Sequence, residues 1–224
     1  GISNANSAVS LTQIADKAMG EESNILDIIK TKLLQAATAT TSTAGHDAIA
    51  KDVDKLLDQI NNIASQTNYN GINLLQASST SADSTAALTF QTGETSSDTI
   101  VTSGGVMANT SGLALTALKG FASNGGGSLN AANASAQLDE LDAALNTLNG
   151  WRADFGSTQN QLESATRNMM TQQTNIKAAE SVIRDVDYAS ESANFNKQNI
   201  ISQAGTYAMS QANSVQQNVL RLLQ

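Results

Sequence analysis

Apolar residues recur at every seventh position along the chain between residues 141 and 183. This row consists of Leu141, Leu148, Phe155, Leu162, Met169, Ile176 and Ile183. A seven-residue repeat keeps one apolar face of a helix turned toward a partner helix and imposes a left-handed supercoil. The row predicts a helix over residues 135–187, with a length of about 80 Å at 1.5 Å per residue.

Two further helices are predicted earlier in the chain. Residues 46–66 contain a row with alternating intervals of four and three, made of Ile49, Val53, Leu56, Ile60 and Ile63. This is the spacing of a coiled-coil seam. Residues 3–40 carry apolar residues at similar intervals, which also favours a helix. A polar run rich in Thr separates the two.

Residues 77–134 differ from the helical segments because they are rich in Ser, Thr, Gly and Asn and carry little charge. Two short runs within them, 87–91 and 99–102, contain alternating or β-branched residues and predict a β-hairpin with a long loop. Residues 113–121 favour a short helix. Before residue 77, the pair Asn70-Gly71 predicts a tight turn.

The three long helices can bury their apolar rows only against one another, so the expected fold class is mainly α. We expect an elongated antiparallel coiled-coil rod over residues 1–187, with the small β-hairpin insert inside residues 77–134. Residues 188–224 then form a separate C-terminal helical extension.

The C-terminal extension carries an apolar face that continues to the end of the sequence. Its residues are Ile200, Ile201, Ala204, Tyr207, Ala208, Ala212, Val215, Val219, Leu220, Leu222 and Leu223. A helix with such a face must pack on its own domain, on a second copy of the chain or on a partner. This face is the candidate interaction site.

The composition argues against an enzyme and against a metal site. The chain has no Cys and a single histidine, His46, which leaves no thiolate nucleophile and no pair of imidazoles for a metal. Asp185 and Asp187 face different sides of a helix, so they are better explained as carboxylates at a helix break than as an acid–base pair. A net charge of −8 without a basic block argues against nucleic acid. We predict no enzyme, no cofactor and no membrane insertion.

Several motifs resemble bacterial flagellin. In the C-terminal third they are RADFGSTQNQL at 152–162, IRDVDYASE at 183–191, QAGT at 203–206 and QANSVQQNVLRLL at 211–223. The earlier motifs are DKAM at 16–19, IASQTN at 63–68, NGINLL at 70–75 and LTFQTG at 88–93. The chain begins with what looks like the interior of the first long flagellin helix. The resemblance thus suggests a flagellin without the N-terminal segment and without large outer domains.

The resemblance implies a structural role and an extracellular location. Residues 1–187 would be the inner rod-like domain, and 188–224 the C-terminal half of the terminal helical domain. The chain would self-assemble into the tubular flagellar filament for motility, after type III export helped by a chaperone. Expected partners are other flagellin subunits, the export chaperone on the candidate interaction site, the export apparatus, the filament cap and the innate immune receptor. The alternatives are a hook–filament junction protein or a secreted coiled-coil adaptor or effector.

One segment departs from many flagellins. The stretch read by the innate immune receptor usually resembles QRVRELAVQ, whereas this chain has LDIIKTKLLQ at residues 26–35. Ile28 and Lys32 stand where an Arg and a Leu are usual. We predict weakened receptor recognition.

Overall fold

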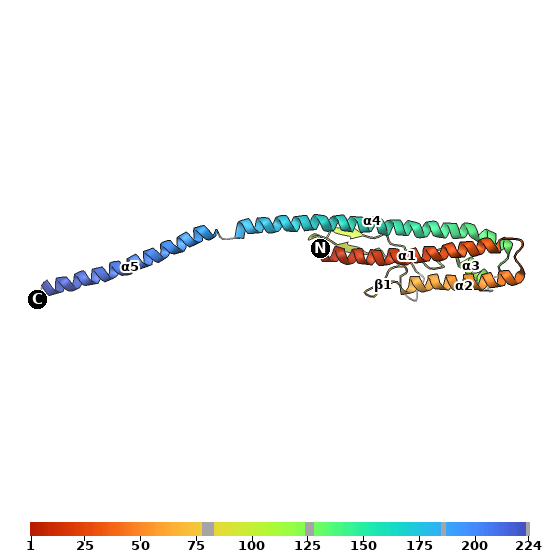
Figure 1. The fold of residues 1–224 in the computed structure, drawn as a ribbon, viewed down its shortest axis with the longest axis horizontal. Coiled ribbons are helices and arrows are strands. Elements are labelled where there is room, and N and C mark those ends of the chain that lie inside the picture. The colour runs from red at the N-terminus through yellow and green to blue at the C-terminus, as the bar shows by residue number, and fades with distance from the viewer. Residues whose placement is uncertain (78–82, 124–127, 185–186, 223–224) are drawn as a thin grey trace. The chain divides into compact units, whose positions relative to one another are not determined.

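The structure, a computed structural model, describes residues 1–77, 83–123, 128–184 and 187–222. It is mainly α, as predicted from the apolar rows (Figure 1). Contacts divide the chain into two units, Gly1–Thr171 and Gln172–Gln224. The elements are α1 (Ile2–Ala36), α2 (Thr43–Gln66), β1 (Asn68–Tyr69), β2 (Ile72–Asn73), β3 (Thr89–Gln91), β4 (Thr99–Val101), α3 (Thr116–Ala122), α4 (Ala131–Arg184) and α5 (Tyr188–Leu222).

In the first unit, α1 packs antiparallel to α4. Lys30, near the end of α1, forms an ion pair with Asp142, near the start of α4. Asp16, earlier in α1, accepts a hydrogen bond of 3.0 Å from Arg152 Nε. The first residues of α1 pack around Leu162. Residue numbers therefore rise along α1 as they fall along α4, which is the antiparallel arrangement that the sequence predicted.

The hydrophobic core of the first unit lies where α1, α2 and α4 meet, and the insert contributes to it. Side chains from residues 74–75 and 113–118 are buried beside those of the helices, so the insert is part of the core. The largest fully buried side chains are Met19, Leu26, Ile29, Leu33, Leu57, Ile60, Leu74, Leu75, Leu113, Leu115, Leu118 and Leu141.

The buried face of α2 is wider than the predicted seam. Three predicted seam residues are buried: Ile49, Val53 and Ile60. In addition Leu57 and Ala64 are fully buried, whereas the neighbouring seam residues Leu56 and Ile63 are half-buried at the margin of the core. α2 contacts both α1 and α3, and a helix with two partners buries more than one narrow stripe.

The seven-residue row of α4 is buried along only part of its length. Leu141, Leu148, Phe155 and Leu162 are buried, and Met169 is half-buried. Ile176 and Ile183 are 65% and 82% exposed. Gly1, at the start of α1, lies beside Met169. Beyond Met169, every residue of α4 as far as Arg184 is exposed, so no described helix buries the last two positions of the row.

Ser42 and His46 form the connection between α1 and α2. Ser42 is the N-cap of α2, and its hydroxyl accepts the N–H of Gly45 at 3.1 Å. This cap places the start of α2 at Thr43, three positions before the predicted start. His46 Nε2 lies 2.8 Å from the carbonyl oxygen of Ala36, the last residue of α1. The only histidine therefore joins two helix ends.

Two antiparallel hairpins flank the helices. Between β1 and β2, Asn70 and Gly71 have φ values of 52° and 81°, the left-handed conformation that a two-residue hairpin turn requires. β3 pairs with β4 as predicted, with Phe90 opposite Ile100. Hydrogen bonds from Thr95 in the connecting loop hold the pKa of Asp98 below its ordinary value.

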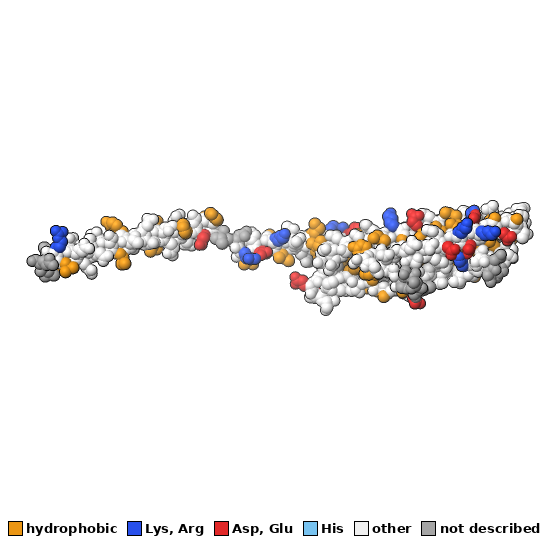
Figure 2. Space-filling view, turned by 90° about the horizontal axis from the view of Figure 1, so that it is seen from below, with side chains coloured by type: hydrophobic (Ala, Val, Ile, Leu, Met, Phe, Trp, Pro, Cys, Tyr) orange, Lys and Arg blue, Asp and Glu red, His pale blue; other side chains and the backbone are white. Residues whose placement is uncertain are grey.

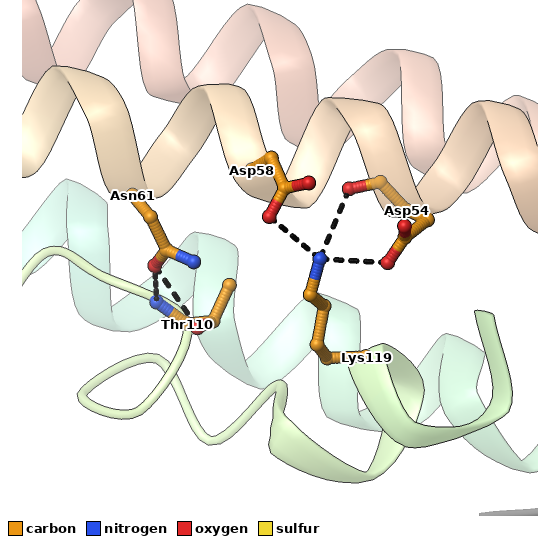
Figure 3. Close-up of polar contacts among 5 residues, drawn as sticks. All are labelled: Asp54, Asp58, Asn61, Thr110 and Lys119. Atoms are coloured by element: carbon orange, nitrogen blue, oxygen red, sulfur yellow. Dashed lines mark hydrogen bonds and ion pairs between the residues drawn. The ribbon is translucent and has the colours of Figure 1, made fainter. Parts of the chain in front are cut away.

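Polar contacts attach the insert to α2 (Figure 3). Lys119 of α3 places its ammonium 2.6 Å from a carboxylate oxygen of Asp54 and 2.6 Å from one of Asp58. Asn61 accepts hydrogen bonds of 3.0 Å from both the N–H and the hydroxyl of Thr110. Burial lowers the pKa of Lys119, but its hydrogen bonds and the charges of both aspartates outweigh burial and raise it.

The second unit consists of the last part of α4 and of α5. Asp187 begins α5, because its carboxylate accepts the N–H groups of Ala189 and Ser190 at 3.0 and 3.2 Å. This residue is therefore a helix cap, whereas Asp185 lies outside the described residues. All residues from 172 to 221 that the structure describes are exposed.

We expect the two halves of the α4 row to differ in their contribution to stability. Leu148→Ala leaves a cavity in the core and should lower the free energy of unfolding by about 2–5 kcal/mol. Ile176→Ala changes an exposed position of the same row and should lower it by less than about 0.5 kcal/mol. Urea unfolding followed by the fluorescence of Trp151, the single tryptophan, measures both. Equal losses for the two variants would contradict this account of the row.

Candidate interaction surfaces

The apolar face predicted from the sequence lies exposed on α5. Ile201 is 55% exposed and Tyr207 is 75% exposed. The other described members of the face are exposed as well: Ile200, Ala204, Ala208, Ala212, Val215, Val219 and Leu220. The side chain of Leu222 and the whole of Leu223 lie outside the described part of the chain. Figure 2 shows apolar side chains, in orange, on the surface of this unit.

The centre of the face contains both small and branched apolar residues, and larger residues border it. At 3.6 residues per turn, Ile201, Ala208 and Val219 lie on one line along α5. Ala212 lies close to the same line and Ala204 about 60° to one side of it. Their small side chains allow another helix to approach the backbone closely there. Ile200 and Tyr207 border this line on one side.

Sequence reasoning missed the apolar residues on the other border of the face. Phe195 and Met209 are 66% and 71% exposed. Helical spacing places both in line with Leu220, which was predicted. The intervals between these residues, 14 and 11 positions, are close to whole numbers of helical turns. Those intervals could have identified them.

α5 carries few charges. Its only charged residues between 188 and 222 are Glu191, Lys197 and Arg221. Glu191 lies in the first turn and Arg221 in the last turn, where each favours the helix dipole. Covering this helix therefore desolvates almost no charge, which suits a surface that a partner buries.

The distal part of α4 presents a second exposed apolar surface. Met170, Ile176, Val182 and Ile183 are all more than half exposed. Two of them belong to the predicted coiled-coil seam. Ile176 and Ile183 keep the seven-residue interval of the buried part of the row, which suits a helix partner, whereas Met170 and Val182 lie on other sides of the helix.

The predicted receptor region lies on the outer side of α1. Ile28 is 46% exposed. Lys32 donates a hydrogen bond of 2.8 Å to Asp52 of α2. That hydrogen bond, together with the positive charges of Lys32 and Lys55, lowers the pKa of Asp52. The side chain of Lys32 is therefore held against α2.

Neither a metal centre nor a membrane span is found among the described residues. Among them, no group of three or more His, Cys, Asp or Glu side chains could hold a metal ion. No helix within the described ranges is both long enough and apolar enough to cross a membrane. The structure offers surfaces for contact with other polypeptides.

Two family descriptions match the chain. Residues 1–80 match the bacterial flagellin N-terminal helical region, and residues 138–223 match the bacterial flagellin C-terminal helical region. The first match contains α1 and α2, and the second contains most of α4 together with α5. Both matched regions contain the long helices.

The sequences of known proteins match this chain over different lengths. Flagellin A of Helicobacter pylori is 59% identical over 86 residues, which are 38% of this chain and only 17% of that protein. The flagellar filament 30.7 kDa core protein of Treponema maltophilum is 33% identical over 98% of this chain and 77% of that protein. Flagellin of Bacillus subtilis is 33% identical over 98% of this chain and 79% of that protein.

The fold agrees with a solved flagellin. The crystal structure of Bacillus cereus flagellin is similar with a TM-score of 0.61 and 30% identity, over 80% of this chain and 95% of that one. Sequence matches along nearly the whole chain and a common fold thus agree. The chain belongs to the bacterial flagellin family, which consists of structural proteins and not of enzymes.

Proposed function

We propose that this chain is a subunit of the extracellular flagellar filament and that it self-assembles by burying the apolar face of α5 against neighbouring copies. The observation that carries this proposal is the contrast between the two units. The first unit buries its apolar rows internally. The second unit exposes every described residue from 172 to 221, including an apolar face that runs along α5.

α4 ends at Arg184 and α5 begins at Tyr188, which supports a division of roles at this point of the chain. We propose that residues 1–187 form the inner rod-like domain and that 188–224 form the C-terminal half of the terminal helical domain. Asp187 supports this boundary because it caps the first turn of α5. The seam residues Ile176 and Ile183 then supply a further contact surface once neighbours are present.

Rough free energies of burial and association favour a polymer of many subunits over an isolated pair. Full burial of a Val, Leu or Ile side chain contributes about 1.5–3 kcal/mol. Because the helix already covers part of each side chain, about 1 kcal/mol each remains for the six larger residues of the α5 face whose side chains the structure describes. Association costs about 4–15 kcal/mol in lost freedom. A contact in which two copies both bury this face gains about 12 kcal/mol, which lies within the range of that cost, so contacts with several neighbours make assembly more favourable.

We expect two substitutions on the central row to abolish self-association. Ile201→Ser with Val219→Ser removes apolar area from the row while leaving helix propensity almost unchanged. The matched control, Gln203→Ser with Gln217→Ser, changes the opposite side of α5. Sedimentation velocity over a range of concentrations, with electron microscopy of the heavy species, measures assembly.

The wild-type chain and the control should assemble, while the row variant should stay monomeric. Assembly of the row variant at the wild-type concentration would contradict the role of this face. A wild-type chain that stays monomeric at every concentration would contradict self-assembly itself.

We propose further that a flagellin export chaperone covers the same face before export, because a helix with an apolar face fits a hydrophobic groove. Calorimetric titration of the full chain with a purified chaperone tests this. The Ile201→Ser, Val219→Ser variant should raise Kd about 30-fold, since the two buried side chains contribute roughly 2 kcal/mol together. The control with the two Gln substitutions should bind like the wild-type chain. Unchanged affinity of the row variant would place the chaperone elsewhere.

We propose last that the region around Ile28 recognises the innate immune receptor weakly. Ile28 is exposed without the charge that an Arg provides, and Lys32 is held by Asp52. In a cell-based receptor assay, the chain should be less potent than a responsive flagellin. Ile28→Arg with Lys32→Leu should raise its potency. Equal potency of the wild-type chain and the responsive flagellin would refute the proposal.

A further inference from the structure

Glu22 of α1 is a carboxylic acid inside the hydrophobic core. Its side chain is 0% exposed, and neither carboxylate oxygen has a hydrogen-bond partner. Its neighbours along the buried face of α1 are Met19, Leu26 and Ile29, all fully buried. No ion pair among the described residues involves Glu22. An acid in such surroundings is strongly disfavoured in its charged form.

On α4, the charged residue closest to Glu22 in the antiparallel register is Arg152. It is bound to Asp16 at 3.0 Å and lies near Gly20. Gly20 and Glu22 are two positions apart, so they face nearly opposite sides of α1.

On α2, the carboxylates of Asp54 and Asp58 are both held by Lys119 of α3. On α1 itself, Lys17, Glu21 and Asp27 are exposed. The core thus surrounds Glu22 with apolar side chains, while the charged groups around it are paired or in solvent.

Burial therefore raises the pKa of Glu22 to about 9. In the unfolded chain water surrounds the carboxyl group, and its pKa returns to an ordinary value of about 4.3. Between these two pH values the folded chain holds a proton that the unfolded chain has lost.

We infer that folding of the α1–α2–α4 bundle takes up one proton at Glu22 throughout the neutral range, so that acid strengthens the bundle and alkali weakens it. The sign follows from linkage. Where the unfolded state binds fewer protons, stability falls as pH rises, and the folding constant falls about tenfold per pH unit. This contribution is fully present below pH 4 and is lost by about pH 9. It opposes the acid sensitivity that paired carboxylates confer.

The other groups with a shifted pKa change the stability of the fold at pH values outside this range. The pKa values of Asp52 and Asp98 are lowered, so their contributions are lost only in acid. The pKa of Lys119 is raised, so its contribution persists until strong alkali. Of these four described residues, Glu22 is the one whose contribution changes between pH 5 and 9.

The test compares Glu22→Gln, which imitates the protonated acid at every pH, with Glu21→Gln at the exposed neighbouring position. Urea unfolding of the full chain, followed by Trp151 fluorescence, gives folding constants from pH 5.5 to 8.5. Relative to Glu22→Gln, the wild-type chain and Glu21→Gln should lose about a thousandfold in folding constant over this range. Parallel pH curves for all three chains would overturn the inference.

A second measurement stays decisive even if Glu22→Gln folds poorly. Carbon-13 NMR of the side-chain carboxyl groups in the folded wild-type chain follows each glutamate directly. One carboxyl resonance, absent from a Glu22→Met sample, should keep the chemical shift of a protonated carboxyl group at pH 7. Titration of every glutamate below pH 6 would refute the proton uptake.

Discussion

The antiparallel packing of α1 against α4, with α2 completing the core, is the constraint on which the first unit depends. Each of these helices has an apolar face that it cannot cover alone. Ion pairs such as Asp16–Arg152 lie at the edge of the contact and are part-exposed, so they fix register and contribute little to stability. Apolar burial holds the helices together, and it also attaches the insert through Leu113, Leu115 and Leu118.

Much of this architecture could be predicted because it depends on periodicity. The heptad row identified α4, and Asn70-Gly71 predicted a turn that the left-handed φ values confirm. Periodicity could not tell how many partners a helix has, so it selected Leu56 on α2 and missed the deeper Leu57. Periodicity also could not show where the partner helix of α4 ends. Ile176 and Leu148 therefore have the same place in the repeat, but Leu148 is buried and Ile176 is exposed.

The spacing of Glu22 in the sequence indicated that it is buried, but its charge argued against a position in the core. Ala15, Met19, Leu26 and Ile29 are buried in α1, and Glu22 occupies the position between them that completes intervals of four, three, four and three. An acid in such a row usually marks the border of a core. Here the surrounding helices close over it. The apolar face of α5 could be recognised from its spacing alone, and the described members of that face are exposed, while its role as a contact surface stays a proposal.

The scarcity of charge on α5 has a consequence for the conditions under which its contacts form. With only three charged side chains, the contact free energy of α5 depends little on ionic screening. Salts that are excluded from protein surfaces, such as sulfate, strengthen apolar burial, and cooling weakens it. Assemblies built on this helix should therefore tolerate changes in salinity, become firmer in sulfate and loosen in the cold.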